Sequence, residues 1–529
     1  MKTLLIYPQF PLSFWSYTKA FELTGKKAAI PPLSLITVAG ILPQDWEFKL
    51  VDRTIRDVTE DEWQWAELVI ISGMIVQQDD FHSQIKEAKR RGKLVAVGGP
   101  YPSSTPKPLK EAGADFLILD EGEITLPMFV EALNRGETEG IFRSEEKCDM
   151  TISPIPRRDL LELEMYESMS VQFSRGCPFQ CEFCDIIVLY GRKPRTKNPS
   201  QVLQELDSLY ELGWIGNVVL VDDNFIGNKR NVKLLLQELK TWQEEHDFPF
   251  SFYTEASVDL AKETELIKLM VECNFWGVFV GIETPDLDSL KITKKYQNLR
   301  DPLVKSINTI VSSGIQVTGG FILGFDGEKD NAADSIFEFI QQTNITNPML
   351  ATLQAVPNTA LWHRLEKEGR LLDSKIFGDT GSLMNFIPER PLETIAQDYM
   401  ETLWKLYDPI RYMERVFKTI MKINENGLDH KHRSSLSSSP FKLLKIIFFI
   451  CWKYGVIVKT RWKFWSYLAQ IFLKYPDWVG SFLIGCGQME HFLEYREIVK
   501  DRISKQLLEY KSSFPTLITK ESESLKIAS

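Results

Sequence analysis

The chain is poor in histidine and cysteine and has no excess of positive charge. Its 529 residues include six histidines and seven cysteines, and its net charge is −10. This acidic balance argues against a nucleic-acid partner, because such partners usually bind a basic face. The cysteines form no evenly spaced disulfide framework. We therefore expect a reducing cytoplasm, where clustered cysteines more often bind metal.

Long uncharged apolar runs are also missing. A membrane-spanning helix needs about 18 or more apolar residues, and the nearest stretch, Phe441–Val458, is interrupted by three lysines. The N-terminal run stops at Pro8 and lacks a signal-peptide pattern, so it predicts a first strand. The length allows roughly two to four domains.

Residues 1–140 alternate short apolar runs with helical patterns. The runs are rich in Val, Ile and Leu and lack polar alternation, as strands covered on both faces do. Five such runs with helices between them predict an α/β fold with a doubly wound, parallel five-stranded sheet. The runs are Thr3–Tyr7, Phe48–Asp52, Leu68–Gly73, Leu94–Gly99 and Phe116–Asp120.

Small and polar residues follow four of these strands. In open α/β sheets, ligands bind beyond the carboxyl ends of the strands, and glycine lets the backbone approach a ligand closely. A tight strand–helix turn explains any one of these groups, but four in one sheet favour a ligand crevice. The groups are Asp52 with Thr54, Ser72 with Gly73, Gly98–Pro100, and Glu121–Glu123.

Residues 141–168 show little periodicity and predict a linker, which a second alternating array follows over residues 169–370. Six strand–helix units predict a partial (β/α)6 barrel of the TIM type, since a complete one has eight. The predicted strands are Ser170–Ser174, Asn217–Asp222, Phe250–Glu255, Val278–Glu283, Gln316–Leu323 and Ala351–Ala355.

Chemistry-bearing groups stand at the carboxyl ends of this array as well. A cysteine loop follows the first strand, Asp222 and Asp223 end the second, Glu255 ends the third and Glu283 ends the fourth. A single carboxylate at a strand end is unremarkable. Carboxylates at three successive strand ends beside a cysteine loop predict an active site at the C-terminal face of the barrel.

Residues 371–529 predict a mostly helical extension. Within it, residues 441–476 hold seven Lys or Arg, no acidic residue and eleven aromatics. Such a segment is typical of a helix lying on an anionic membrane surface. The alternative is a helical cap that packs its aromatics on the barrel and exposes its lysines.

The strongest signal is the loop Ser174–Cys184, SRGCPFQCEFC. Cys177, Cys181 and Cys184 are separated by three and then two residues, and thiolates are the usual ligands of iron–sulfur clusters. Three thiolates on a four-iron cluster leave one iron open for a ligand. A structural zinc site needs four ligands, and the other cysteines are scattered, so zinc is the weaker interpretation.

This C-x3-C-x2-C loop after the first barrel strand resembles the radical S-adenosylmethionine superfamily. The resemblance implies a [4Fe–4S] cluster on the three cysteines, with S-adenosylmethionine chelated to the unique iron. One-electron reduction by a flavodoxin- or ferredoxin-type partner would then cleave it to a 5′-deoxyadenosyl radical. The aromatic before the third cysteine, here Phe183, packs near the adenine in the family.

Further positions match the S-adenosylmethionine site of this superfamily. By the resemblance, Asp222 contacts the methionyl amino group, since an ammonium favours a carboxylate partner. Glu255 would bind the ribose hydroxyls. Gly281-Ile282-Glu283 resembles the strand-four motif, and the glycine pattern of Gly320 and Gly324 resembles the strand-five motif that lies against adenine. Close helix–strand packing also explains that glycine pattern.

The N-terminal sheet resembles the cobalamin-binding domain that precedes many radical enzymes. The domain's pattern D-x-H-x-x-G stands here as Asp52-x-Thr54-x-x-Asp57, so the cobalt-binding histidine is replaced. Either cobalamin binds without a protein ligand on its lower face, or the domain has lost it. The other predicted contact residues are Ser72, Gly73, Met74, Gly98, Gly99, Pro100, Glu121 and Gly122.

Both modules together imply methylation of an unactivated carbon in a small or lipid substrate. Residues 171–197, the segment Asp222–Arg230 and the long extension resemble the group that contains hopanoid C-2 methylases, so a hopanoid is one candidate substrate. Two alternatives remain. One is a cobalamin-dependent radical rearrangement, oxidation or cyclisation without methyl transfer, and the other is a non-enzymatic cobalamin sensor.

Overall fold

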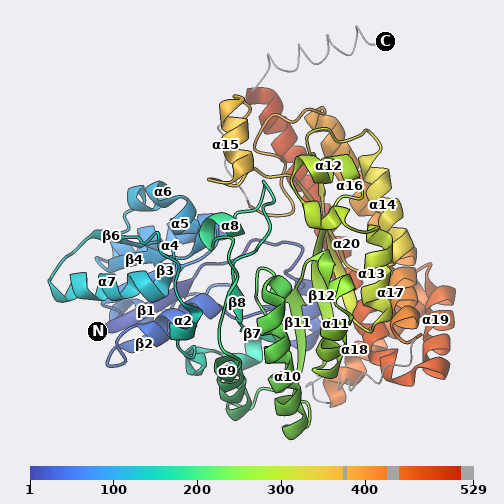
Figure 1. The fold of residues 1–529 in the computed structure, drawn as a ribbon, viewed down its shortest axis with the longest axis horizontal. Coiled ribbons are helices and arrows are strands. Elements are labelled where there is room, and N and C mark those ends of the chain that lie inside the picture. The colour runs from blue at the N-terminus through green and yellow to red at the C-terminus, as the bar shows by residue number, and fades with distance from the viewer. Residues whose placement is uncertain (373–377, 426–439, 514–529) are drawn as a thin grey trace.

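The structure is a computed structural model that describes residues 1–372, 378–425 and 440–513. Figure 1 shows three parts: a blue α/β sheet at the left, a green and yellow strand–helix array in the centre, and orange and red helices at the right. No helix among the described residues is long and apolar enough to cross a membrane.

The N-terminal part is a six-stranded parallel sheet with the order β2-β1-β3-β4-β5-β6. The five predicted strands are confirmed. The sixth, β6, pairs with β5 at the start of the predicted linker and is too short to be recognised from periodicity. The strands are β1 (Lys2–Tyr7), β2 (Glu47–Asp52), β3 (Leu68–Ser72), β4 (Leu94–Gly98), β5 (Phe116–Ile118) and β6 (Gly140–Phe142).

Helices cover both faces of this sheet, which is why its strands are apolar on both sides. Trp63 and Phe81 pack on one face, and Ile36 and Phe129 on the other. The strand order reverses between β1 and β3, and the crevice at such a point is where open α/β sheets bind ligands. The helices are α2 (Leu33–Ile41), α3 (Glu60–Trp65), α4 (Gln78–Arg90), α5 (Pro100–Ser104), α6 (Pro106–Glu111) and α7 (Gly122–Asn134).

The central part is a second six-stranded parallel sheet, with its strands in sequence order from β7 to β14. All six predicted strands are confirmed, and the array is a partial barrel. Its strands are β7 (Ser168–Val171), β10 (Gly216–Leu220), β11 (Phe250–Glu255), β12 (Phe275–Glu283), β13 (Gln316–Leu323) and β14 (Pro348–Thr352). Its helices are α9 (Pro199–Glu211), α10 (Lys229–Glu245), α11 (Thr264–Glu272), α12 (Leu287–Ile292), α13 (Leu303–Ser312) and α14 (Ala332–Thr343).

A small antiparallel hairpin interrupts this array just before and after the cysteine loop. It consists of β8 (Ser174–Arg175) and β9 (Arg195–Thr196), with the short helix α8 (Ile186–Leu189) between them. Two-residue strands carry no periodicity, so the sequence does not reveal them. The hairpin fixes both ends of the loop that carries the three cysteines.

The C-terminal part is helical, as predicted. Its helices are α15 (Ala360–Lys367), α16 (Leu392–Leu406), α17 (Pro409–Ile423), α18 (Pro440–Trp452), α19 (Arg461–Lys474) and α20 (Val479–Ser513). Helix α16 covers the edge strand β14, where the Tyr399 hydroxyl donates to the Leu350 carbonyl. Helix α20 packs on α1 (Thr18–Thr24), so an N-terminal helix lies beside the last helix that the structure describes. The domain boundaries at residues 140, 168 and 370 stay a proposal.

Candidate functional site

The cysteine loop begins with a backbone turn that requires glycine. Gly176 has a φ of +93°, and a Cβ there would lie 2.9 Å from the Gly191 carbonyl oxygen. The Cys177 N–H donates to that same carbonyl at 3.3 Å. The hairpin therefore closes the loop at its first cysteine.

The three cysteines of the loop are free thiols in a largely buried setting. Burial raises the pKa of Cys177 and of Cys184. Side-chain amides approach two of the sulfurs: Asn224 Nδ2 lies 4.0 Å from Cys177 Sγ, and Gln297 Nε2 lies 3.5 Å from Cys181 Sγ. Amide donors of this kind tune an iron–sulfur cluster.

The donor set fits a cluster better than a single ion. Within residues 1–372, 378–425 and 440–513, no three His, Cys, Asp or Glu side chains form a group that could hold one metal ion. A four-iron cluster is larger than one ion, so its thiolate ligands need to be spaced apart around it. Three thiols on one loop, without a fourth ligand, are what a cluster with an open iron requires.

Phe183 belongs to the cysteine loop, and its ring lies near residues of the barrel. The Lys295 ammonium sits 5.7 Å from the centre of its ring, and the Phe325 ring lies 5.8 Å away. Next to it, Glu182 is buried and accepts a 2.8 Å hydrogen bond from Arg364 on α15. Helix α15 of the C-terminal part therefore also contacts the cysteine loop.

The two carboxylates after β10 have different partners. Asp222 accepts the Phe173 N–H at 2.8 Å and the Ser174 hydroxyl at 2.6 Å, and burial raises its pKa to about 6. Asp223 accepts the Gly176 N–H at 2.8 Å, and burial raises its pKa to about 7. Asp222 thus ties β10 to the strand before the cysteine loop, while Asp223 reaches the loop itself.

Glu255 is the last residue of β11. Its side chain is solvent-accessible, yet burial among surrounding groups raises its pKa to about 7, with Asp223 and Asp222 adding to the effect. No Lys or Arg among the described residues forms an ion pair with Glu255 or Asp223. Several carboxylates kept close together without a cation form a site for a positively charged ligand.

The end of β12 is held by residues that the sequence did not single out. Glu283 has a φ of +66° and forms an ion pair with Lys295. Asn298 Nδ2 donates to the carbonyls of Gly281 and Ile282 at 3.1 and 3.0 Å. Lys295, Gln297 and Asn298 lie in and beside the turn η7 (Tyr296–Leu299), whose polar cluster KKYQN was the available signal.

The two predicted glycines of β13 have packing reasons of their own. A Cβ at Gly320 would lie 2.7 Å from Phe279, and one at Gly324 would lie 2.7 Å from Met384. Gly324 also has a φ of +95°, and its N–H donates to Glu328. Contact of these glycines with an adenine therefore stays a prediction.

At the edge of the first sheet, Asp52 is directed into the protein. One carboxylate oxygen accepts the Thr54 N–H at 2.8 Å and the other the Tyr166 hydroxyl at 3.2 Å, and burial raises its pKa to about 6. Thr54 itself is half-buried. Asp52 thus shapes the β2 turn and joins it to residues before the barrel.

The loops after β3 and β4 lie against each other. Gly99 has a φ of +97°, and a Cβ there would lie 2.6 Å from Ser72 Oγ and 3.2 Å from Gly73. Gly98 packs against the Ile118 carbonyl in the same way, and Pro100 opens α5. Met74 is exposed, while the buried Gln77 accepts its N–H at 2.8 Å.

Glu121 and Glu123 bind two arginines of the β8–β9 hairpin, a set we call the arginine clamp. Arg195 contacts Glu121 at 2.6 and 2.8 Å, and Arg175 contacts Glu123 at 2.8 and 2.9 Å. Burial alone would raise the pKa of Glu123, but Arg175 lowers it to about 2. Arg175 directly precedes Gly176 and Cys177. The clamp therefore joins the first sheet to the cysteine loop.

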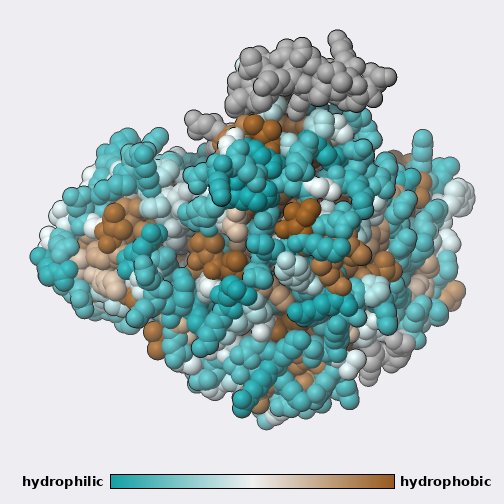
Figure 2. All heavy atoms as spheres, turned by 45° about the horizontal axis from the view of Figure 1, so that its top comes forward, coloured by the Kyte–Doolittle hydropathy of each residue, from teal (hydrophilic) through white to brown (hydrophobic). Residues whose placement is uncertain are grey.

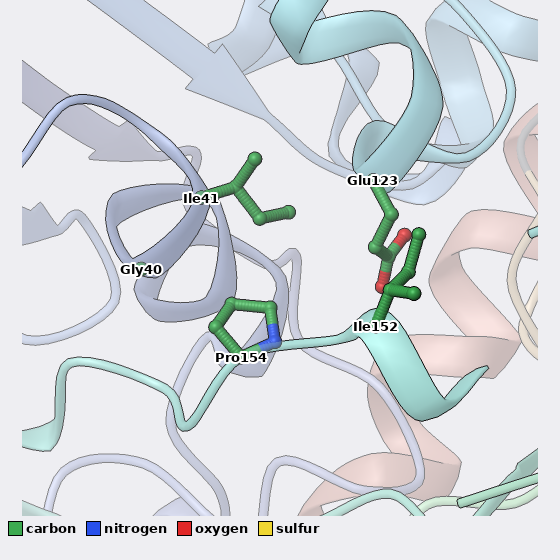
Figure 3. A pocket seen from close by; sticks show the side chains of 5 residues that line it. All are labelled: Gly40, Ile41, Glu123, Ile152 and Pro154. Atoms are coloured by element: carbon green, nitrogen blue, oxygen red, sulfur yellow. The ribbon is translucent and has the colours of Figure 1, made fainter. Parts of the chain in front are cut away.

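Two features border the clamp. Cys148 Sγ lies 3.7 Å from both arginines, and its N–H donates to Glu121 at 2.8 Å. A hollow of about 260 Å³ is lined by Gly40, Ile41, Glu123, Ile152 and Pro154, the residues labelled in Figure 3. Glu123 is already engaged by Arg175 and the Ser153 hydroxyl, so this hollow is a junction between α2, α7 and the linker.

Other contacts turn the edge of the first sheet toward the barrel mouth. Asn358, which follows β14, donates to the Ser104 carbonyl at 3.0 Å, and Gly378 lies against Ile75. The ring of Trp15 lies 5.8 Å from that of Phe279 on β12. The predicted groups of the two sheets therefore face one another.

Comparison with known proteins agrees with this arrangement. Residues 171–340 match the model of the Radical SAM superfamily, and residues 359–505 match a domain of unknown function, DUF4070. An uncharacterized methyltransferase of Synechocystis sp. is 60% identical, covering 97% of this chain and 95% of its own. The hopanoid C-2 methylase of Rhodopseudomonas palustris is 34% identical, covering 88% of each chain.

Solved structures share the fold. The radical S-adenosylmethionine methyltransferase TsrM from Kitasatospora setae, with cobalamin and a [4Fe–4S] cluster bound, covers 94% of this chain and 100% of its own at a TM-score of 0.60 and 16% identity. The cobalamin-dependent S-adenosylmethionine radical enzyme OxsB covers 97% and 80% at a TM-score of 0.60 and 14% identity. From its cysteine loop, fold and relatives, the chain belongs to the radical S-adenosylmethionine superfamily, in the group that includes hopanoid C-2 methylase.

Proposed function

We propose that this protein is a cobalamin-dependent radical S-adenosylmethionine enzyme that methylates an unactivated carbon of a small or lipid substrate. The observation that carries the proposal is the arginine clamp. It joins the strand-end loop of a cobalamin-type sheet to the residue two places before the first cluster cysteine. The relatives named as methyltransferases and methylases support the same reaction.

Cys177, Cys181 and Cys184 would hold the cluster, with Asn224 and Gln297 donating toward two of the sulfurs. The cluster and S-adenosylmethionine, when bound, supply one-electron cleavage chemistry. Asp223 and Glu255 would bind the positively charged amino end of the cofactor, because neither carboxylate forms an ion pair among the described residues. For Glu255 this replaces the ribose contact that the family resemblance implies. Asp222 would position Asp223 through the backbone before the loop.

The edge of the first sheet would hold cobalamin. Small and uncharged groups stand there at Thr54, Gly73, Met74 and Gly99, while Asp52 and Glu121 are directed into protein contacts. Thr54 occupies the place of the cobalt-binding histidine in the family pattern. Its hydroxyl cannot replace the imidazole as a ligand of cobalt. We therefore propose that this chain binds cobalamin without a protein ligand on cobalt.

The test is an anaerobic preparation loaded with iron, sulfide and cobalamin, incubated with S-adenosylmethionine, a low-potential reductant and extracts of membrane lipids. We expect both 5′-deoxyadenosine and S-adenosylhomocysteine, with a methylated product. Deoxyadenosine without S-adenosylhomocysteine would instead establish the rearrangement or oxidation alternative. Full biological effect from the Cys177→Ala, Cys181→Ala, Cys184→Ala variant would establish the sensor alternative.

The substrate and partners complete the proposal. We propose a hopanoid as the first substrate to test, because a relative that covers 88% of this chain is named hopanoid C-2 methylase. Hopanoid profiles of a deletion strain, with and without the restored gene, would decide it. A flavodoxin- or ferredoxin-type protein would supply the electron. We further propose a cytoplasmic location with peripheral membrane contact through residues 441–476.

A further inference from the structure

The segment from α18 to α19 exposes an unusual number of large apolar side chains. Ten of them are exposed between residues 444 and 473, including Phe448, Trp462 and Leu473 at 68%, 77% and 82%. Elsewhere, exposed apolar residues are scattered along the chain. The face in Figure 2 is mostly hydrophilic with small separate apolar patches. Large exposed apolar surfaces mark interaction sites.

Helix α18 is apolar on both its inner and its outer side. Ile450 is buried, and Ile446 and Ile447 pack on the core. Leu444, Phe448 and Trp452 are exposed and follow each other at intervals of four residues, so they form one outward stripe. A helix with an apolar stripe on its outer as well as its inner side needs an apolar environment on that second side.

The neighbouring helix α17 shows the ordinary arrangement. It buries Tyr412, Val416 and Ile420 and exposes Arg411 and Lys418. The same C-terminal extension therefore contains a normal amphipathic helix directly beside the anomalous segment. The outward apolar stripe of α18 is thus specific to this segment.

The turn η8 (Lys453–Ile457) and helix α19 continue the exposed surface. Val456 and Ile457 are exposed in the turn. The Trp465 indole N–H donates to the Gly455 carbonyl at 2.9 Å, which places this ring directly on η8. Helix α19 buries Phe464 and Ile471 and turns Trp462, Trp465, Phe472 and Leu473 outward. We call the exposed apolar residues of 444–473 the aromatic surface.

The charges around the aromatic surface are mostly positive. Lys459, Arg461 and Lys474 are exposed, and the Arg461 guanidinium lies 5.8 Å from the centre of the Trp462 ring. Two acids that contact this segment are paired, Glu490 with Lys453 and Glu414 with Lys463. The exposed Asp477 lies just beyond it. Residues 441–476 contain no Asp or Glu. The partner of this surface therefore has an apolar interior and an anionic boundary.

We infer that the aromatic surface docks in the headgroup region of an anionic phospholipid bilayer. Trp side chains favour that boundary, and neighbouring Lys and Arg attract anionic lipid. A second copy of the chain is a poorer occupant. A two-fold interface brings identical patches together, so the cations of both copies would repel. The inference deepens the peripheral membrane contact proposed above and does not depend on methyl transfer or on any cofactor.

Vesicle flotation of the full chain tests this inference. One set of vesicles is pure phosphatidylcholine, and in the other about one third of the lipid is phosphatidylglycerol. We expect the wild type to float with the anionic vesicles, and binding to fall as salt rises. The variant Phe448→Ser, Trp462→Ser, Leu473→Ser should bind about tenfold less, since it removes three inserted apolar groups.

A matched control uses equally exposed residues from other parts of the chain. Ile141, Ile215 and Leu508 are exposed at 63%, 60% and 69%, and their triple replacement by Ser should leave flotation unchanged. All six positions are at the surface, so both variants should keep the wild-type circular dichroism. A second variant, Lys459→Glu, Arg461→Glu, Lys474→Glu, should abolish the preference for anionic vesicles.

Two results would overturn the inference. One is equal flotation of wild type and Phe448→Ser, Trp462→Ser, Leu473→Ser. The other is a wild-type dimer in sedimentation velocity that this variant converts to monomer, without vesicle binding by either protein. Deoxyadenosine formation on a water-soluble test substrate is measured in parallel. If neither the wild type nor the variants form deoxyadenosine, that result counts against the proposed function, and the docking result still stands.

Discussion

Each of the two parallel six-stranded sheets has a pair of carboxylates at its strand ends, and the two pairs differ in their partners. At the edge of the first sheet, Glu121 and Glu123 are paired with arginines from the barrel. At the mouth of the second, Asp223 and Glu255 have raised pKa values near 7 and no ion pair among the described residues. Burial raises the pKa of a carboxyl group, and an adjacent cation lowers it.

The difference separates assembly from binding. A carboxylate with a raised pKa and no ion-pair partner destabilises the folded protein when it is charged, and such groups cluster at sites where a ligand supplies the charge. A carboxylate that already has its arginine has no such demand. Glu121 and Glu123 therefore hold the parts together, and we propose that Asp223 and Glu255 receive a cationic ligand.

The largest effect is expected from replacing a cysteine that would hold the cluster at the barrel mouth. Cys177→Ala should remove the brown absorbance of the reconstituted cluster and lower deoxyadenosine formation by about a thousandfold or more, since a cluster with two thiolate ligands is not retained. Iron and sulfide content measure the first effect and product analysis the second. Cys451→Ala is the control, and a cluster that survives Cys177→Ala would contradict the assignment.

The clamp comes next in size. Glu123→Gln leaves the buried Arg175 guanidinium with only the more distant Glu121, 3.9 Å away, as a counter-charge. Breaking a buried pair costs about 3 kcal/mol or more of stability. The urea midpoint of the apoprotein should fall accordingly. The exposed pair Arg135–Glu137 gives the control, because Glu137→Gln should cost about 0.5 kcal/mol or less. Equal midpoints for the two variants would remove the distinction between assembly and binding.

Glu255→Gln tests the opposite side of the comparison. It removes a carboxylate kept without a cation, so S-adenosylmethionine binding measured by calorimetry should weaken about tenfold. The midpoint temperature of thermal unfolding of the apoprotein should rise, whereas the loss of a stabilising carboxylate would lower it. The folded-state pKa lies above the unfolded value, so the charged form costs stability above about pH 4.5. Glu211→Gln, at an exposed helix position, should change neither quantity.

The smallest effect is a pH dependence. Glu255 has a pKa of about 7, and only its charged form attracts an ammonium. Affinity for S-adenosylmethionine should therefore fall about threefold between pH 7.5 and pH 6.5, as the carboxylate gains its proton. Glu255→Gln should flatten this profile. A wild-type affinity independent of pH over that range would show that Glu255 does not meet the cofactor.

Sequence reasoning recovered the elements whose physics is local. The apolar strands of both sheets, the cysteine loop and the carboxylates at the strand ends all follow from periodicity and spacing. The strands β6, β8 and β9 escaped because two or three residues have no period. Long-range pairs escaped for a different reason: Glu121 and Arg195 are far apart in the chain, and nothing in either segment indicates the other.

The same limit explains why the sequence did not reveal the protein partners of Glu121 and Asp222. The resemblance assigned the first to cobalamin and the second to the methionyl ammonium. The structure gives each a protein partner, Arg195 and Ser174 respectively. Lys295 and Asn298 were missed because their partners, Glu283 and the Gly281 carbonyl, become neighbours only when the turn after β12 folds back. Direct contact of Glu121 or Asp222 with a cofactor stays a prediction.

The arginine clamp also constrains how chimeras of this family can be built. A first sheet exchanged between relatives would bring its own acids at positions 121 and 123, while Arg175 and Arg195 would stay with the recipient barrel. Acids and arginines are then inherited as a unit of four, although they sit in separate modules. A recombination point between the modules is permissible only when both parents carry that unit, so module shuffling is limited by charge matching as well as by fold.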